Sequence, residues 1–274
     1  TIKNYLQEQY PLLDEIAIID GDSKDRTVEI AKEQGVAVFS EKEVLADTGV
    51  QLGKGEALWK SIAALKGDII AWIDTDIRNI DPHFVYGIIG PLLKYPKLQF
   101  SKAYYRRPIK VGETLKKTGG GRVTELVVRP IFNLFYPELA AFAQPLSGEY
   151  AGRRSLLETI PFYTGYAVET GLVVEIWRRL GLEAMAQVDL DERIHENQST
   201  LALGKMSFEI IQAIFELLQE DGKLTLGTDI NQIFQLVGCD NGKCEIEAKK
   251  VEVVKRIPMI EIEEYQKIKR KTNH

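Results

Sequence analysis

Two carboxylates at the end of an apolar stretch are the first residues here whose types and spacing could do chemistry. The stretch "GDIIAWIDTDIRNIDP" spans residues 67–82 and places Asp74 and Asp76 on either side of Thr75. Residues two apart on an extended chain project to the same side, so the carboxylates would lie about 6 to 7 Å apart. Hard oxygen ligands favour magnesium, with manganese as the alternative. Such acids equally cap helices or solvate loops, so a metal or nucleotide site is one of two interpretations.

The stretch "RIHENQ" (193–198) adds an imidazole to this set. Arg193 and Asn197 would share a face with His195 if the chain stays extended. A lone histidine is more often structural than a ligand. This one shares a predicted sheet edge with the two aspartates, where imidazole can complete a metal site.

The stretch "TGGGRVTEL" (118–126) places three glycines ahead of a predicted helix. Glycines let backbone amides approach an anion, and a helix start adds partial positive charge. Arg122 can clamp a phosphate or carboxylate while Thr124 donates its hydroxyl. The spacing matches neither the phosphate loop of nucleotide triphosphatases nor the dinucleotide fingerprint, and a flexible connector is the alternative.

Three further stretches carry polar candidates. "GKGEALWK" holds Lys54 between two glycines before a helix, where an ammonium can neutralise a diphosphate. "TGYAVE" places Tyr166 and Glu169 three residues apart, and this glutamate can bond sugar hydroxyls or favour the helix dipole. Arg106 and Arg107 of "YYRRP" are interpreted as solvated or structural.

A doubly wound α/β fold is predicted to position these residues. Apolar runs at 14–20, 36–40 and 68–74 alternate with helical patterns at 28–35 and 56–67, which indicates a parallel sheet covered on both faces. Such sheets bind ligands beyond the carboxyl ends of their strands. Downstream, strands are expected at 98–109 and 185–198, helices at 83–96 and 203–222, and loops leading into helices at 118–139, 144–160 and 164–181.

Length and charge narrow the function classes. The 274 residues fit one large domain with an appendage, and 40 acidic against 35 basic residues give a net charge of −5. This balance argues against a general nucleic-acid or membrane-surface role, so an anionic ligand must meet locally arranged cations. No apolar run approaches the roughly 20 residues that span a bilayer, and no signal peptide is visible, so we predict a cytoplasmic protein. The chain starts without the strand expected first, which suggests that upstream residues are missing.

The two cysteines are four residues apart. Cys239 and Cys244 flank "DNGK", which is typical of a hairpin turn. A disulfide or half of a zinc site is conceivable, and two reduced thiols are the preferred interpretation.

The order of these motifs resembles the GT-A nucleotide-sugar glycosyltransferases, and more narrowly the glucosyl-3-phosphoglycerate synthase family. The similarity spans about residues 12–215 and rests on "GKGEALWKS", "WIDTDIRN", "FVYGIIGPLL", "YYRRP", "TGGGRVTEL", "PLSGEYAGRR", "GYAVETGL" and "RIHENQ". It implies a Rossmann-like, mostly parallel central sheet with helices on both faces. A GT-A domain would span 1–222, with a nucleotide-sugar half at about 1–110 and an acceptor half at about 111–222. Residues 223–274 would form an extension that mediates homodimerisation.

The resemblance also implies a reaction. Glucose would pass with retention from UDP-glucose to the 2-hydroxyl of 3-phosphoglycerate, with magnesium on the diphosphate, in the synthesis of glucosylglycerate or a related polysaccharide. Asp76 and His195 would hold the metal, and Gly121, Arg122, Thr124 and Asn197 would bind the acceptor. The expected catalytic residues are Asp76, Lys54, Glu169 and Leu146. The donor would contact Asp20, Gly21, Lys54, Asp74, Thr75, Leu146, Tyr166, Glu169 and Arg193.

The sequence departs from the family's pattern in two places, and two alternative functions stay open. The family's upstream strand and its uridine-cupping loop are absent here, and Gly21 and Asp22 replace a serine that often follows the second strand. No nucleophile for a double displacement can be named, and a front-face reaction is what the resemblance suggests. A polyprenyl-phosphate sugar transferase is the rival enzyme, and a catalytically silent sugar-nucleotide binder is the rival from another class.

Overall fold

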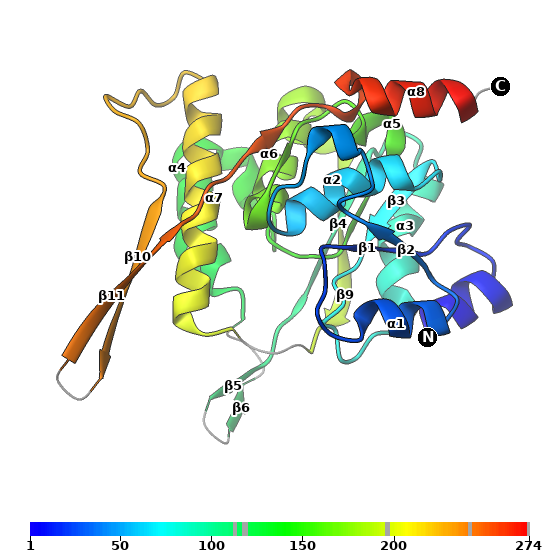
Figure 1. Cartoon of the computed structure of the whole chain (residues 1–274), viewed down its shortest axis with the longest axis horizontal. Coiled ribbons are helices and arrows are strands. Elements are labelled where there is room, and N and C mark those ends of the chain that lie inside the picture. Colours follow the sequence, from blue (N-terminus) through cyan, green and yellow to red (C-terminus); the bar gives the residue numbers. More distant parts are fainter. Residues whose placement is uncertain (112–113, 117–119, 195–197, 241–242, 273–274) are drawn as a thin grey trace.

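A mixed four-stranded sheet forms the centre of the protein (Figure 1). The computed structural model describes residues 1–111, 114–116, 120–194, 198–240 and 243–272. The strands lie in the order β3 (Ile69–Trp72), β7 (Tyr150–Arg153), β4 (Phe100–Arg106) and β9 (Met185–Glu192). β7 is antiparallel to β3 and to β4, whereas β4 and β9 are parallel. β3, β4 and β9 therefore run in one direction, and their carboxyl ends meet at one edge of the sheet, as predicted.

The antiparallel strand β7 makes the central sheet mixed, whereas its other three strands run in one direction as expected. Its residues were predicted to belong to a loop leading into a helix, and the segment "YAGR" is short and contains no β-branched side chain. In the fold, β7 is hydrogen-bonded on both sides, and Ala151 lies fully buried between Ala71 and Ser101. Pairing on both edges, rather than local propensity, makes this segment a strand.

The amino-terminal strands form a separate parallel pair. β1 (Ala17–Asp20) pairs with β2 (Ala37–Ser40), and the helix α1 (Thr27–Glu33) connects them, as the spacing predicted. Within the described residues, β3 pairs with β7 and not with this pair. The three early strands are thus split between two sheets.

Helices cover both faces of the central sheet. On one face, α2 (Lys54–Ala64) and α6 (Val168–Leu180) pack against Trp72, Phe100 and Tyr150, with Trp59 fully buried between them. On the other face, α3 (His83–Lys94) packs against Ala103 and other residues of the opposite strand parity. This two-sided burial follows from the period of two along each strand and explains why β3 is apolar throughout.

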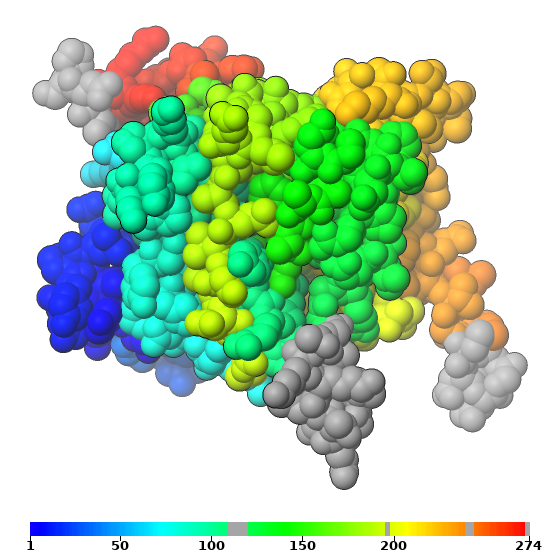
Figure 2. Space-filling view, turned by 180° about the vertical axis from the view of Figure 1, so that it is seen from behind, coloured from blue at the N-terminus to red at the C-terminus, as the bar shows by residue number. Residues whose placement is uncertain are grey.

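A third apolar cluster joins the segment from Val123 to Leu146 to the long helix α7 (Thr200–Glu220). α4 (Arg129–Phe135) and α6 pack against α7, and Figure 2 shows the opposite face, where β9 lies between the segment around α3 and the segment around α4. The short elements are η1 (Asn4–Gln9), η2 (Ala46–Thr48), β5 (Ile109–Val111), β6 (Thr114–Lys116), η3 (Thr124–Val128), η4 (Pro137–Ala141), α5 (Arg154–Leu157), β8 (Phe162–Tyr163), η5 (Gly165–Ala167) and η6 (Leu182–Ala184). No helix in the described ranges has both the length and the apolar character that crossing a bilayer requires.

The segment after residue 222 has two parts. β10 (Ile233–Asp240) and β11 (Lys243–Lys250) form an antiparallel hairpin that projects away from the body (Figure 1). β12 (Lys255–Arg256), η7 (Met259–Glu261) and α8 (Glu263–Thr272) instead return to the body, where β12 pairs with β8 and Met259 is fully buried in the α2 and α6 cluster. The division of the chain at residue 222 stays a prediction.

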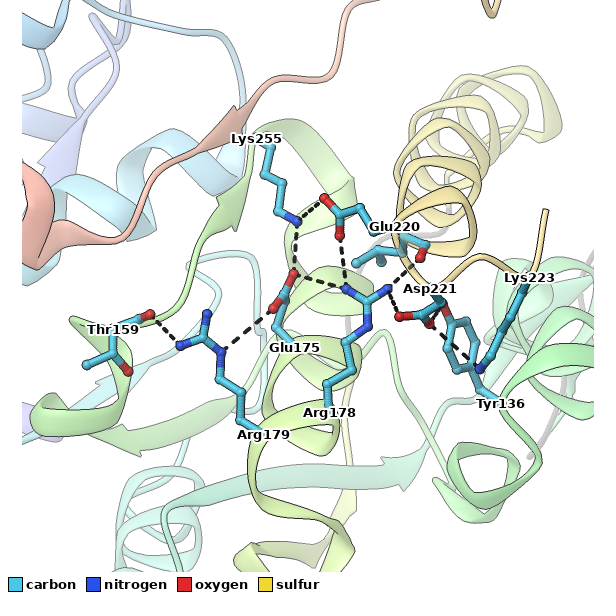
Figure 3. A network of polar contacts seen from close by, with 10 residues as sticks. Tyr136, Thr159, Glu175, Arg178, Arg179, Glu220, Asp221, Lys223 and Lys255 are labelled. Atoms are coloured by element: carbon cyan, nitrogen blue, oxygen red, sulfur yellow. Dashed lines mark hydrogen bonds and ion pairs between the residues drawn. The ribbon is translucent and has the colours of Figure 1, made fainter. Parts of the chain in front are cut away.

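A polar network attaches this returning segment to α6 and α7 (Figure 3). Lys255 Nζ lies 2.9 Å from a carboxylate oxygen of Glu175 and 2.6 Å from one of Glu220. Arg178 reaches Glu220 at 3.0 Å and Asp221 at 2.7 Å. These partly buried pairs join three elements that are distant in the sequence.

The hairpin corrects the preferred interpretation of the cysteines. Cys239 and Cys244 are cross-strand partners, and Cys244 is disulfide-bonded rather than a reduced thiol. Directly opposed residues of an antiparallel pair lie about 4.5 to 5.5 Å apart between their Cα atoms, which is within the range that a disulfide needs. The antiparallel pairing of β10 with β11 confirms the predicted hairpin.

Candidate active site

One cavity of about 310 Å³ lies at the sheet edge where β3, β4 and β9 end. It brings together most of the residues singled out from the sequence, although they come from stretches far apart in the chain. Its lining consists of Lys54, Asp74, Thr75, Asp76, Arg107, Gly120, Gly121, Arg122, Val123, Thr124, Leu146, Tyr166, Glu169, Arg193, Gln198, Leu203 and Met206.

Asp74 and Asp76 follow β3 and share one guanidinium. Arg193 Nη2 lies 3.0 Å from Asp74 Oδ2 and 2.6 Å from Asp76 Oδ1, and its Nε lies 3.6 Å from Glu149. Burial opposes the charge on Arg193, but the pKa of its side chain is raised because Tyr105 and the carboxylates of Glu149, Asp74 and Asp76 favour that charge. Ion pairs of Arg193 therefore connect the carboxyl ends of β3 and β9.

Lys54 forms the second cation of this end of the cavity. Its Nζ lies 2.5 Å from Asp74 Oδ1 and 2.8 Å from Glu169 Oε1. Burial disfavours the ammonium, yet the two carboxylates outweigh that effect and raise the pKa of Lys54 well above its ordinary value. Burial would also raise the pKa of Asp74, but Lys54 and Arg193 bring it below its ordinary value.

The glycines beside Lys54 permit a close approach of two loops. A Cβ on Gly53, whose φ is +96°, would lie 2.7 Å from the Cα of Gly165, and a Cβ on Gly55 would lie 1.9 Å from the carbonyl oxygen of Tyr163. Larger residues at either position would separate Lys54 from the α6 start that carries Glu169. The Gly-Lys-Gly pattern thus has a steric cause.

Tyr166 and Glu169 lie at the start of α6, as their spacing predicted. Glu169 is 3% exposed and is held by Lys54, whereas Tyr166 is 38% exposed and also lines the cavity. The backbone N–H of Tyr166 donates to Glu209 of α7 at 2.8 Å. The helix α7 therefore fixes the turn that presents both side chains.

The opposite end of the cavity is built by the glycine loop. Gly121 has a φ of +79°, a conformation that favours glycine, and Thr124 begins η3 with 2% exposure. Arg122 Nη2 donates to the carbonyl oxygen of Gln198 at 2.8 Å. Arg122 and Thr124 thus reach the same cavity as the aspartates, which the sequence could predict only through the resemblance.

Four predicted site residues are not placed in this cavity. Asp20 and Gly21 are absent from its described lining, and the Asp20 carboxylate accepts backbone N–H bonds from Asp22 and Ser23, so it closes its own turn. His195 and Asn197 lie outside the described residues. The roles of all four stay predictions.

A buried layer behind the cavity was missed by sequence reasoning. Lys102 is 1% exposed, its Nζ donates to the Ser147 carbonyl at 2.8 Å, and it lies 4.2 Å from the centre of the Tyr150 ring. Burial lowers the pKa of Lys102 to about 7. A lysine in the middle of the apolar run "FSKAYY" was the available signal, because the period of two points it to the same face as Phe100.

Gly148 is the second residue that sequence reasoning missed. A Cβ at this position would lie 1.9 Å from Asp74 Oδ2, so only glycine lets the Asp74 carboxylate occupy its place between Lys54 and Arg193. Leu146 of the same loop, "PLSGE", lines the cavity, as the family resemblance implied. Nothing in its sequence indicates the contact with Asp74.

Asp76 offers a carboxylate oxygen to a divalent cation, although the described residues contain no group of three or more His, Cys, Asp or Glu side chains that could hold a metal ion. Asp76 keeps 59% of its side chain exposed, although Arg193 binds one of its oxygens, and its carboxylate lines the cavity. Carboxylate oxygens are the ligands that magnesium and manganese prefer. Asp76 can therefore serve as a ligand without leaving its ion pair.

The comparisons with known proteins decide the family. The family model described as glycosyl transferase family 2 matches residues 1–166. The chain belongs to glycosyltransferase family 2. This membership confirms the GT-A expectation for the α/β fold.

Individual relatives of this family are similar over nearly the whole chain. A glucosyl-3-phosphoglycerate synthase from Petrotoga mobilis is 50% identical over 97% of this chain and 82% of its own length. The structure of a mannosyl-3-phosphoglycerate synthase from Rubrobacter xylanophilus matches with a TM-score of 0.86 and 40% identity, over 94% of this chain and 81% of that one. A glucosyl-3-phosphoglycerate synthase from Mycobacterium tuberculosis, solved with Mn²⁺, UDP and glucosyl-3-phosphoglycerate, matches with a TM-score of 0.80 and 39% identity, over 94% and 86%. The narrower resemblance is thereby confirmed.

The contact of Gly148 with Asp74 generates a first prediction. Gly148→Ala should lower kcat/KM of this glycosyltransferase roughly 100-fold, because a displacement of about 1 Å at a charged site has that scale of effect. Steady-state transfer kinetics measure this. Gly90→Ala is the matched control, since a Cβ there meets nothing within 4 Å and alanine suits the interior of α3. Equal kinetics for both variants would contradict the steric role.

The depressed pKa of Lys102 generates a second prediction. Between about pH 7 and 10.5, the unfolded chain binds a proton on Lys102 that the folded protein lacks, so this group makes the free energy of unfolding rise with pH. Below pH 7 the folded protein retains the full cost of the buried charge. Urea unfolding from pH 6.5 to 9.5 should show the wild type gaining a few kcal/mol relative to Lys102→Met, at about 1.4 kcal/mol per unit of pKa shift. The exposed Lys97→Met is the control, and parallel pH profiles for wild type and Lys102→Met would refute the assignment.

Proposed function

We propose that this protein is a glucosyl-3-phosphoglycerate synthase, which transfers glucose with retention from UDP-glucose to the 2-hydroxyl of 3-phosphoglycerate. The observation that carries the proposal is the single cavity in which the Asp74 and Asp76 pair, Lys54 and Glu169 meet the Gly121 to Thr124 loop. The 50% identical relative carries this name, and a structural relative was solved with the product of this reaction. Synthesis of glucosylglycerate, or of a related polysaccharide, is part of the proposal.

The aspartate end of the cavity receives the sugar nucleotide. Glu169 is nearly buried and ionically held by Lys54, so its carboxylate is fixed for hydrogen bonds to sugar hydroxyls, with Tyr166 beside it. Lys54 is an ammonium at neutral pH, because its pKa is raised by Glu169 and Asp74. A fixed cation here stabilises the negative charge that develops on the leaving diphosphate.

A divalent cation is part of the proposed reaction. Bound to Asp76, with His195 as the further predicted ligand, magnesium or manganese would neutralise the diphosphate as the glycosidic bond breaks. Magnesium is the proposed physiological ion, and manganese is the ion in the solved relative. Leu146 lines the cavity, and its apolar side chain would exclude water from the reacting sugar. We also propose a cytoplasmic location, as predicted from the sequence.

The direct test is transfer by the full chain. UDP-glucose, 3-phosphoglycerate and Mg²⁺ should give UDP and glucosyl-3-phosphoglycerate, whereas omission of the acceptor or addition of a chelator should abolish UDP release. A GDP-linked hexose replaces UDP-glucose in a parallel reaction, because the Rubrobacter relative is named for mannose. Acceptor-independent release of UDP would refute the proposed synthase, and faster transfer from the GDP sugar would reassign the donor.

Two substitutions separate the ends of the cavity in this assay. Asp76→Ala should lower kcat at least 100-fold, because it removes the metal ligand and one partner of Arg193. Arg122→Ala should instead raise the acceptor KM roughly 10- to 100-fold with little change in the UDP-glucose KM, since hydrogen bonds between charged groups contribute about 1.5 to 3 kcal/mol. A normal acceptor KM in the Arg122 variant would contradict its role.

We further propose that the β10–β11 hairpin binds a second copy of the chain. Val237 and Ile246 are directly opposed across the hairpin and are 59% and 66% exposed, so they form an apolar patch on an element that projects from the body. In sedimentation velocity, the wild type should sediment as a dimer. Val237→Asp with Ile246→Asp should give a monomer, because two opposed carboxylates would be buried, whereas Leu93→Asp on exposed α3 should not. A monomeric wild type would refute the dimer.

A further inference from the structure

The cationic side chains that line the cavity differ in whether a described carboxylate pairs with them. Lys54 and Arg193 are each paired with at least two carboxylates. Arg107 and Arg122 line the same cavity, and no described carboxylate lies in ion-pair distance of either guanidinium. In a protein with a net charge of −5, two guanidinium groups without described counter-ions at one end of a cavity favour an anionic ligand with two charged groups.

Arg107 is held against the glycine loop. It directly follows β4, and its carbonyl oxygen accepts the backbone N–H of Gly120 at 3.2 Å. A Cβ on Gly120 would lie 2.4 Å from the Cβ of Arg107, so only glycine lets the loop approach this side chain. Arg107 and the Gly121 to Thr124 loop thus form one wall of the cavity.

Tyr105 fixes the direction of the Arg107 side chain. Arg107 Nη2 donates to the Tyr105 hydroxyl at 3.1 Å, and the guanidinium carbon lies 4.8 Å from the centre of the Tyr105 ring. The same hydroxyl accepts a hydrogen bond from Arg193 Nη1 at 3.2 Å. Tyr105 is 2% exposed, so it is a rigid support that keeps Arg107 close to the residues around Arg193.

We propose that Arg107 binds the carboxylate of the acceptor, as the partner of Arg122 on its phosphate. This assignment rests on the proposed function and deepens it, because it names the residue that distinguishes a phosphorylated acid from a simple phosphate ester. A guanidinium binds a carboxylate through two parallel N–H donors, and one already restrained by Tyr105 loses little side-chain entropy on binding. Arg107 therefore sets acceptor specificity, and Tyr105 is its positioning residue.

The cations at the donor end are already paired with carboxylates, unlike Arg107 within the described residues. This difference supports a role for Arg107 in binding the acceptor rather than the donor. Arg193 and Lys54 carry carboxylates that already balance much of their charge, and the diphosphate there arrives with a divalent cation. The acceptor arrives without one in the proposed reaction. Its two anionic groups need cations from the protein itself, and Arg107 and Arg122 are the two that the described lining of this end provides.

The test compares ligands that differ by one group. KM and kcat are measured with 3-phosphoglycerate for the wild type, Arg107→Met, Arg107→Lys and the control Arg106→Met. Arg106 is the exposed neighbour, and it is not part of the cavity lining. Glycerol 3-phosphate, which has the phosphate but no carboxylate, is measured as a competitive inhibitor of each variant. Thermal unfolding checks that each variant is folded.

We expect Arg107→Met to raise the KM for 3-phosphoglycerate roughly 10- to 100-fold, as for the loss of a charged hydrogen-bonded pair. The inhibition constant of glycerol 3-phosphate and the KM for UDP-glucose should change less than about threefold. Arg107→Lys should restore part of the affinity for 3-phosphoglycerate, because it keeps the charge but not the fork. Arg106→Met should behave as the wild type.

Other outcomes overturn the assignment. Equal weakening of both ligands would mean that Arg107 contacts the phosphate or only supports the loop, and a raised UDP-glucose KM would place it at the donor. An Arg107→Met enzyme with wild-type constants would also refute it. If the wild type itself transfers no glucose to 3-phosphoglycerate, the proposed function falls whatever the variants do, so the two failures are distinguishable.

Discussion

The ion pairs of Arg193 with Asp74 and Asp76 are the interaction on which the rest of the site depends. Arg193 is 5% exposed on its side chain and follows β9, the edge strand of the sheet, whereas the two aspartates follow β3 at the other edge. The guanidinium thus connects strand ends separated by β7 and β4. Loss of a carboxylate partner destabilises this site mainly through Arg193, because the nearly buried guanidinium keeps its charge in a poorly solvated place. The ion pairs of Arg193 therefore both hold together the strand ends that shape the cavity and determine the charge of this part of its wall.

Much of the fold and part of the site could be predicted from the sequence. The apolar run before Asp74 and the spacing of β1, α1 and β2 follow from local periodicity, and these elements lie where they were expected. β7 could not be predicted, because "YAGR" becomes a strand only when β3 and β4 pair with it on both sides. The disulfide of Cys244 was missed for a related reason, since it depends on a strand register rather than on spacing alone.

The missed site residues share a physical cause. Gly148 matters through its contact with Asp74, Lys102 through the Ser147 carbonyl and the Tyr150 ring, and Arg107 through Gly120 and Tyr105. Each of these contacts joins segments that are distant in the chain or depends on a backbone path that no local pattern encodes. Local reasoning therefore interpreted Arg107 as solvated or structural, although it lines the same cavity as Arg122.

The free oxygen of Asp76 would allow the proposed cation site and the salt bridge to Arg193 to coexist. Only Oδ1 of Asp76 is engaged by Arg193, and more than half of the side chain stays exposed to the cavity. Asp74, by contrast, has both oxygens bound, one by Lys54 and one by Arg193. A divalent ion entering the cavity therefore meets one aspartate with an available lone pair and one that is already neutralised. Asp76 is thus suited to be the metal ligand, and Asp74 to hold Lys54 and Arg193 in place around it.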